Sequence, residues 1–472
     1  MTSENRRIIL VLSAFCILFV GLVGYLSYFQ VFKAEAVKNN SYNKRLWINE
    51  ENVLRGSIMD RNGNVLAYSE KDGEINKRYY KYGNLYSHII GYSYREYGKA
   101  GLELEYNNVL LDISESAALN ELKNLVLPSS VGNNLKLTID HSTQEKARSL
   151  LNGRKGSIVL MNPKTGEIYA MVSLPDFNVA NLNENWKEIT ENPDSPLLNR
   201  ATQGLYTPGS IFKMVTTLGV LESFSLDLEY NCVGSTVIDG YKLTDYNERA
   251  HGKLNLHDAF VKSCNPYFAE KAVVMGKDKF GEVAERFMIN KKIHFDLPVK
   301  TSQFPYKGNV EETEIAASGI GQGRVVVTPL NMAMMASAIA NEGEMVKPIL
   351  VKEIIDKDGR ILKVMDTEVI STVTGPSVAN TIKDMMVDTV KAGTGTNARI
   401  RNVTVAGKTG TAENPSGKSH SWFVGFAPAE DPRLAIAVVL EEAGDTGGQG
   451  AAPIARDLFI HGLNNIDFEE EY

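Results

Sequence analysis

Ser210 and Lys213 have the residue types and the spacing of a nucleophile and its base. The segment YTPGSIFK (residues 206–213) breaks the chain at Pro-Gly and then begins an apolar helical pattern, so we expect Ser210 at a helix N-terminus. Negative charge is favoured there, and Lys213 lies one turn further along the same face. A lysine can take a serine proton where burial favours its neutral amine. The pair predicts acyl transfer without histidine, although a simple N-cap role for Ser210 stays open on this segment alone.

Two later segments carry matching chemistry. A Ser-Cys-Asn run ends the helical pattern that begins at Leu256, and a Lys-Thr-Gly-Thr run lies on a strand-like segment over residues 403–411. Chance copies exist in an S-x-x-K at residues 41–44 and a K-T-G at residues 164–166, but the former lies in a polar stretch and the latter fits a hairpin turn. The three segments occur in this order along the chain, each on the expected kind of element, and together they predict one site. Besides Ser210 and Lys213, the predicted site residues are Ser263, Asn265, Lys408, Thr409, Gly410 and Thr411.

This order of S-x-x-K, S-x-N and K-T-G resembles the penicillin-binding proteins and serine β-lactamases. Additional runs resemble the class B penicillin-binding proteins, the monofunctional transpeptidases of bacterial cell walls. These runs are RGSIMDRNG (55–63), GLE (101–103), IGQG (320–323), VTP (327–329) and WFVGF (422–426). The resemblance covers nearly the whole chain.

The resemblance implies a D,D-transpeptidase that cross-links peptidoglycan stem peptides through an acyl-enzyme and is acylated by β-lactam antibiotics. It implies that Ser210 attacks, that Lys213 takes its proton and that Ser263 helps carry it to the leaving amine. Asn265 is expected to bind the substrate backbone, and the substrate carboxylate is expected to bind Lys408, Thr409 and Thr411. Gly410 leaves room for the substrate along the strand, and the backbone N–H groups of Ser210 and Thr411 are expected to form the oxyanion hole.

Alternatives use the same motifs. A β-lactamase or a D,D-carboxypeptidase would pass the acyl group to water, and a β-lactam sensor or scaffold would bind the drug or a partner protein without transferring the acyl group.

The resemblance also implies a membrane partner, a SEDS-family glycosyltransferase, contacted by the membrane segment and residues 30–135. The sequence leaves open whether the protein serves elongation, division or sporulation.

A membrane segment is expected to anchor this chemistry. Residues 8–29 contain no charged side chain, and as a helix they extend about 33 Å, enough to cross a bilayer core. Arg6 and Arg7 precede them, so we expect a cytoplasmic N-terminus and an extracytoplasmic catalytic part. The alternative is a cleaved signal peptide, for which residues 34–36 (Ala-Glu-Ala) resemble a cleavage site, but this apolar core is longer than usual.

The remaining composition is that of an ordinary globular protein. The 472 residues are 43% hydrophobic and 23% charged with a net charge of −7, which suggests two or three domains and argues against nucleic-acid binding. We expect a cytoplasmic leader (1–7), the anchor (8–29), a small pedestal (30–155) and a transpeptidase domain (156–472). The 30–155 segment is too short for the glycosyltransferase domain of class A relatives.

The expected fold class is α+β, an antiparallel sheet covered by helices. The pattern predicts a hairpin at residues 56–70 turning at Asn62-Gly63, a hairpin of half-buried strands over 156–173, and strands at 403–411, 421–427 and 434–441. A strand is expected at 135–139, and helices over 117–127, from 142, and around 210–224, 256–272, 329–341 and 453–463. Residues 79–106 are rich in tyrosine and have no clear pattern.

The three cysteines exclude a disulfide scaffold, and no Cys/His cluster has zinc-like spacing, so we expect no metal and no cofactor. Cys264 is expected to pack inside its motif, and a Cys232–Cys264 disulfide stays open. His251 precedes the helix that carries Ser263, and we expect a structural role for it, because no Ser/His/Asp order surrounds it.

Overall fold

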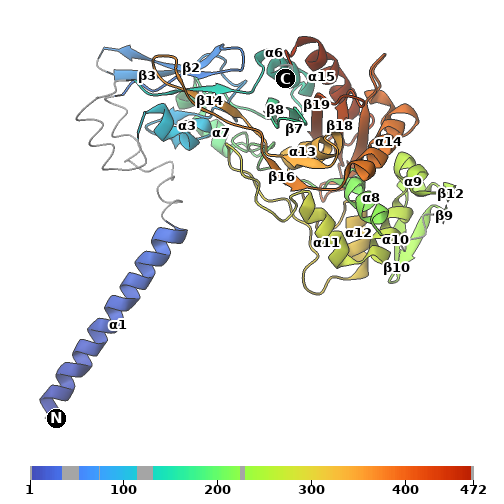
Figure 1. The fold of residues 1–472 in the computed structure, drawn as a ribbon, viewed down its shortest axis with the longest axis horizontal. Helices are drawn as coiled ribbons and strands as arrows, with labels where there is room; N and C mark the ends of the chain where they lie inside the picture. Colours follow the sequence, from blue (N-terminus) through green and yellow to red (C-terminus); the bar gives the residue numbers. More distant parts are fainter. Residues whose placement is uncertain (1–2, 34–52, 74, 114–130, 224–228, 469–472) are drawn as a thin grey trace.

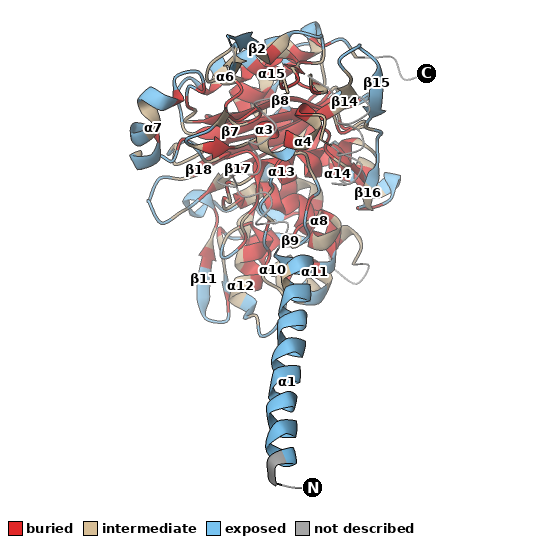
Figure 2. Ribbon diagram, turned by 90° about the vertical axis from the view of Figure 1, so that its left-hand side faces the viewer, coloured by how far each residue is buried: buried red, intermediate tan, exposed pale blue. Residues whose placement is uncertain are grey.

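The structure is a computed structural model that describes residues 3–33, 53–73, 75–113, 131–223 and 229–468. Within them, one helix, α1 (Ser3–Phe32), is long and apolar enough to cross a membrane. Its described side chains are almost all exposed, whereas the rest of the chain contains a large buried core (Figure 2). The expected helix at 117–127, the residues resembling a cleavage site and most of the polar stretch before residue 55 lie outside the described residues.

Most of the chain after residue 140 is organised around a five-stranded antiparallel sheet (Figure 1). Its order is β17 (Ala406–Ala412), β18 (His420–Ala427), β19 (Leu434–Leu440), β7 (Gly156–Met161) and β8 (Ile168–Leu174). Helix α13 (Pro329–Ala340) packs on one face, and helices α6 (His141–Leu151) and α15 (Ala451–Asn465) pack on the other. The expectation that β7 and β8 are half-buried is therefore wrong, because every residue of both strands is buried between two helical layers.

A helical region lies beside the β17 end of this sheet. It contains α8 (Lys213–Leu221), α9 (Leu256–Lys262), α10 (Asn265–Met275), α11 (Lys277–Arg286) and α12 (Glu312–Gly319). Two short strand pairs flank it, β9 (Tyr230–Cys232) with β12 (Gly252–Leu254), and β10 (Ser235–Ile238) with β11 (Tyr241–Thr244). Helix α14 (Pro376–Ala392) packs against both α9 and β17, and so connects this region to the sheet.

The N-terminal sheet is built by two distant parts of the chain. Its order is β15 (Ile361–Val364), β14 (Val351–Ile355), β6 (Asn134–Leu137), β1 (Ile58–Met59), β2 (Val65–Asp72) and β3 (Ile75–Tyr80). Strands β1 and β2 form the predicted hairpin, with Gly63 at φ +84° in the turn. Strands from both sides of residue 156 share this sheet, since β6 pairs with β14. The expected domain boundary at residue 156 stays a prediction.

The motifs at residues 55–63 and 101–103 meet inside this N-terminal part. The Glu103 carboxylate is fully buried and pairs with the guanidinium groups of Arg55 and Arg78. These two arginines hold the pKa of Glu103 below its ordinary value despite the opposing effect of burial. The charged cluster therefore joins the chain before β1 to the short helix α3 (Leu102–Glu105) and to β3.

The tyrosine-rich segment without a predicted pattern forms short elements. They are β4 (Ser93–Tyr94), β5 (Gly98–Lys99), α3 and α4 (Asn107–Leu110). The rings of Tyr92, Tyr94 and Tyr97 belong to a small apolar cluster with residues of helix α7 (Leu182–Glu191). Tyr97 stacks on Trp186 with ring centroids 4.4 Å apart. The remaining small pair is β13 (Glu344–Val346) with β16 (Val369–Thr372).

Candidate active site

Ser210 lies in a single 3-10 turn, η2 (Gly209–Phe212), that leads directly into α8. Gly209 has φ +58°, and a Cβ there would lie 2.8 Å from the carbonyl oxygen of Thr411, so this position requires glycine. The Gly209 N–H also donates to the Gly321 carbonyl at 2.8 Å. The turn therefore holds Ser210, which is only partly buried, against strand β17 at the start of a helix.

Lys213 is the first residue of α8 and is fully buried. Its Nζ donates to the Ser263 carbonyl at 2.7 Å, to Ser263 Oγ at 3.2 Å and to Asn265 Oδ1 at 2.7 Å. Burial lowers the pKa of Lys213 to about 8, although the nearby Asp245 carboxylate acts in the opposite direction. About one tenth of this amine is therefore neutral at pH 7 and about half at pH 8, and the neutral form is the one that a general base requires.

Ser263 separates two helices that the sequence pattern predicted as one. Helix α9 ends at Lys262, Ser263 takes a left-handed conformation with φ +61°, and α10 begins at Asn265. This break turns the Ser263 hydroxyl and the Asn265 amide toward Lys213. The S-x-N run is therefore a tight turn between two helices, where the sequence pattern predicted one continuous helix around 256–272.

Lys408 approaches the same hydroxyl from the sheet. It is fully buried on β17, and its Nζ donates to Ser263 Oγ at 3.0 Å. Burial lowers the pKa of Lys408 well below its ordinary value, and the neighbouring Lys213 lowers it further. Ser263 Oγ therefore lies between two amines, and since a hydroxyl can accept two hydrogen bonds and donate one, its own proton stays free to be donated.

Strand β17 is one of the two edge strands of the five-stranded sheet and carries the rest of the K-T-G-T segment. A Cβ on Gly410 would lie 2.7 Å from the carbonyl oxygen of Pro208, so glycine allows the turn before Ser210 to approach the strand. Thr409 Oγ1 is 2.6 Å from Thr394 Oγ1, and Thr411 Oγ1 accepts from the N–H of Gly447 at 3.2 Å. Both threonine hydroxyls are thus held in place by neighbouring loops.

The structure links Lys213, Ser263, Asn265 and Lys408 by hydrogen bonds. Ser210 is positioned by its backbone, and its Oγ makes no hydrogen bond within the part of the chain that the structure describes. The WFVGF motif is strand β18, where Trp422 Nε1 donates to the carbonyl of Thr207 at 3.0 Å. This bond joins the sheet to the chain just before the serine, a function that the sequence motif alone did not reveal.

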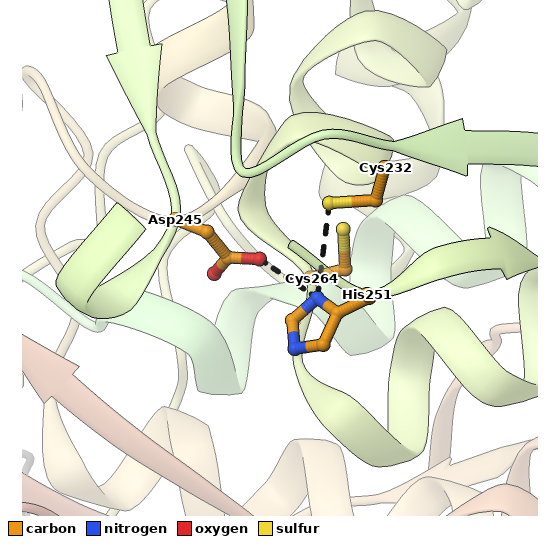
Figure 3. A group of neighbouring side chains, drawn as sticks. All are labelled: Cys232, Asp245, His251 and Cys264. Atoms are coloured by element: carbon orange, nitrogen blue, oxygen red, sulfur yellow. Dashed lines mark hydrogen bonds and ion pairs between the residues drawn. The ribbon is translucent and has the colours of Figure 1, made fainter. Parts of the chain in front are cut away.

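Sequence reasoning missed a second group of side chains beside the S-x-N turn. Cys232, Asp245, His251 and Cys264 lie together (Figure 3), although they come from four segments of the chain. Both cysteines are free thiols, so no Cys232–Cys264 disulfide is present in the structure. Cys232, His251 and Cys264 each drew attention in the sequence, but nothing there placed them together or pointed to Asp245, because the four residues have no short, recognisable spacing.

Comparison with known proteins gives concordant matches. Residues 156–459 match the family described as "Penicillin binding protein transpeptidase domain", and residues 55–134 match the "Penicillin binding protein A dimerisation domain". The peptidoglycan D,D-transpeptidase PbpA of Mycolicibacterium smegmatis is 31% identical over 97% of this chain and 98% of its own length. The peptidoglycan D,D-transpeptidase MrdA of Acinetobacter baumannii is 32% identical over 82% of this chain and 66% of its own length.

Solved structures agree with these matches. The D,D-transpeptidase domain of a peptidoglycan glycosyltransferase from Eggerthella lenta has a TM-score of 0.80 at 34% identity, covering 88% of this chain and 99% of its own. Penicillin-binding protein A of M. tuberculosis, as its ceftriaxone acyl-enzyme complex, has a TM-score of 0.81 at 28% identity with the same coverage of both chains. The expected α+β fold is therefore confirmed.

Proposed function

The chain belongs to the penicillin-binding protein transpeptidases, and from this premise we propose that Ser210 is the nucleophile of a peptidoglycan D,D-transpeptidase. The observation that carries the proposal is the chain of hydrogen bonds from Lys213 through Ser263 to Lys408 beside the turn that holds Ser210. This arrangement supplies a base, a proton carrier and a second buried amine within one site. It needs no histidine.

Acylation begins at the carbonyl between the two terminal D-alanines of a stem peptide. Ser210 Oγ attacks this carbon while the neutral amine of Lys213 takes the hydroxyl proton. The N–H groups of Ser210 and Thr411 stabilise the oxyanion, where one such donor contributes roughly 3–4 kcal/mol. The proton then passes through Ser263 to the leaving amine, the C–N bond breaks, and D-alanine departs.

Deacylation repeats these steps with an amine in place of the leaving group. The amine of a neighbouring stem peptide attacks the ester carbonyl and loses a proton to Lys213, and Ser210 recovers its hydroxyl when the C–O bond breaks. During acylation, the carboxylate of the donor peptide is bound by Lys408, Thr409 and Thr411. Asn265 binds its backbone. β-Lactams acylate Ser210 because their strained amide occupies the position of the D-alanyl bond.

The test is covalent labelling of the full-length chain with a fluorescent penicillin. Peptide mapping by mass spectrometry is expected to place the adduct on Ser210, and Ser210→Ala should abolish labelling. Ser149→Ala is the matched control, because Ser149 lies exposed on α6 and its hydroxyl contacts only its own helix. Labelling that survives in Ser210→Ala would disprove the assignment. A long-lived adduct distinguishes a transpeptidase from a β-lactamase, which would release the hydrolysed drug rapidly.

The same proposal places the chain in the membrane with α1 as a single span. Arg6 and Arg7 keep the N-terminus cytoplasmic, so the transpeptidase half (156–472) and the pedestal (30–155) lie outside. Protease added to intact spheroplasts is expected to degrade the catalytic half and to leave an N-terminal epitope protected. If the catalytic half is protected instead, the proposed orientation in the membrane is wrong.

We also propose a SEDS-family glycosyltransferase as a partner that binds the span and residues 30–135. Exchange of residues 8–29 for an unrelated membrane span is expected to weaken co-purification of the two proteins. A substitution confined to the catalytic half, such as Ser210→Ala, should leave co-purification unchanged. Equal recovery after the exchange would assign the contact to the pedestal alone.

A further inference from the structure

A cavity of about 410 Å³ lies between the N-terminal part of the chain and the region that matches the transpeptidase family. One wall is built by the segment that leads into α3 and includes His88, Tyr92 and Glu105. The other wall comes from residues between 177 and 203, among them Phe177 and Thr202, and from residues 297–298. None of the candidate catalytic residues lines this cavity, so it is a separate site.

Aromatic rings form part of the cavity wall. Phe177 lies edge-on to His88 with ring centroids 5.4 Å apart, and edge-on to Tyr92 with centroids 6.2 Å apart. Burial lowers the pKa of His88 to about 4, and its Nε2 donates to the carbonyl of Pro196 at 2.7 Å. The imidazole is therefore neutral near pH 7, and this aromatic wall is of the kind against which an organic cation packs.

Two acceptor groups on the cavity lack partners among the residues that the structure describes. Thr202 is only 1% exposed, and its Oγ1 has no hydrogen-bond partner there. The Glu105 carboxylate has no ion pair and no hydrogen bond in the same part of the chain, and partial burial raises its pKa above the ordinary value. A buried hydroxyl needs a partner, and a partly desolvated carboxylate is stabilised by a cation. Both groups therefore favour a ligand that donates hydrogen bonds and carries positive charge.

Lys99 also lines the cavity, but its ammonium group is bonded within the buried charged cluster of the N-terminal part. Its Nζ donates to Asn107 Oδ1 at 2.6 Å, and the same oxygen accepts from the Arg55 guanidinium at 2.8 Å. Arg55 in turn pairs with the Glu103 carboxylate. The positive charge of Lys99 is thus held on the Asn107 side, and the negative charge of Glu105 is left for a ligand.

We propose that this cavity binds the primary ammonium group of an unbranched alkyl chain, as found in a lysine side chain or a free alkylamine. The ammonium donates to the Glu105 carboxylate and to Thr202 Oγ1, and the methylene chain packs against Tyr92 and Phe177. The volume lies within the roughly 300–1,000 Å³ that small-molecule sites occupy. Because Glu105 and Thr202 come from different walls, the ligand bridges the two parts of the chain.

Binding is tested by saturation-transfer NMR on the full-length protein in detergent, with protein-free micelles as the blank. The probes are the methylamide of Nα-acetyl-lysine and butylammonium, and the neutral comparison is the ε-hydroxy analogue of the lysine probe. The ammonium probes are expected to bind with dissociation constants of about 1 mM, and the hydroxy analogue about tenfold more weakly. Absence of binding by both ammonium probes, or equal binding of the hydroxy analogue, would overturn the proposal.

The two ammonium probes also distinguish the two sources of this chemistry. Tighter binding of the lysine probe would support a lysine side chain carried by a peptide as the ligand. Equal or tighter binding of butylammonium would support a free alkylamine. Both results require the ammonium group, so both support the cavity as its site.

Variants of the cavity wall locate the bound probe. Glu105→Gln changes a solvent-accessible side chain and should weaken binding of the lysine probe about tenfold, whereas binding of its hydroxy analogue stays the same. Thr202→Val keeps the shape of the wall and should weaken the lysine probe by about threefold or more. Glu188→Gln is the matched control, because Glu188 is exposed on α7 and does not line the cavity. Equal binding of the lysine probe by wild type and Glu105→Gln would overturn the assignment.

The cavity is tested separately from the proposed function. Wild type whose Ser210 has been acylated with penicillin is expected to bind the lysine probe as tightly as untreated protein does. Loss of probe binding after acylation would place the probe at Ser210 and overturn the cavity as its site. Protein that is acylated at Ser210 but binds neither ammonium probe would refute this inference and leave the proposed function standing. Protein that binds the probe through Glu105 without acylation at Ser210 would do the reverse.

Discussion

Titration of Lys213 should control the rate at which Ser210 is acylated. Burial lowers the pKa of Lys213 to about 8, so its base form makes up about one hundredth of the protein at pH 6, one tenth at pH 7 and half at pH 8. The rate constant for acylation is expected to rise about tenfold from pH 6 to pH 7 and about fivefold from pH 7 to pH 8. Between pH 8 and pH 9 it should rise less than about twofold.

The companion variant is Lys213→Arg, which keeps a positive charge in the buried position. A guanidinium does not lose its proton at these pH values, so this variant has no base form. Acylation should fall by about a hundredfold or more at pH 8, and the rise with pH should disappear. Because the positive charge next to Ser263 is kept, the Lys213→Arg variant tests the loss of proton transfer and not the loss of charge.

The assay is stopped-flow fluorescence of penicillin binding to the full-length protein, with circular dichroism at each pH to confirm an unchanged fold. A wild-type rate that is flat from pH 6 to pH 9 would refute Lys213 as the base. So would a rising limb that persists in Lys213→Arg. If the rise is lost in Lys213→Arg but the wild-type midpoint lies far from pH 8, Lys213 remains the base. The lowering of its pKa by burial to about 8 would then be contradicted.

Three further predictions follow from contacts around the site and in the N-terminal part. Gly410→Ala places a methyl group 2.7 Å from the carbonyl of Pro208, and should destabilise the protein by about 1–3 kcal/mol in urea unfolding and slow acylation; unchanged values would contradict the packing. Glu103→Gln leaves two buried arginines without their carboxylate and should cost about 3–5 kcal/mol, whereas labelling of the folded protein persists; a neutral effect would show that the pair is dispensable. Trp422→Phe removes the hydrogen bond to Thr207 and should cost about 1 kcal/mol and slow acylation without changing its pH midpoint; a shifted midpoint would implicate the lysine environment instead.

Local patterns in the sequence predicted the elements that they encode directly. The hairpin at Asn62-Gly63, the strands at 421–427 and 434–441 and the helix at 329–341 are confirmed, because turn residues and apolar periodicity act over short distances. Ser210 was expected at a helix N-terminus and lies in a 3-10 turn that precedes the helix. The K-T-G segment was expected on a strand and forms β17.

Features set by distant contacts were missed. The burial of β7 on both faces depends on α6, which directly precedes it, and on α13, which comes much later in the chain. The break at Ser263 depends on contacts with Lys213 and Lys408 that stabilise a left-handed residue. The group around His251 is assembled from four segments, so no short spacing could reveal it. Tertiary packing, which local propensity does not encode, decided each of these cases.

The shared N-terminal sheet constrains the order in which the chain can fold as it is synthesised. Strands β1, β2, β3 and β6 are synthesised early, but their neighbours β14 and β15 follow only once the ribosome has reached residues 351–364. Until then β6 presents an unpaired edge, which is a site for mispairing with other extended chains. The last stage of N-terminal folding therefore waits for most of the catalytic half, and a chain that stops before residue 351 leaves this sheet without two of its six strands.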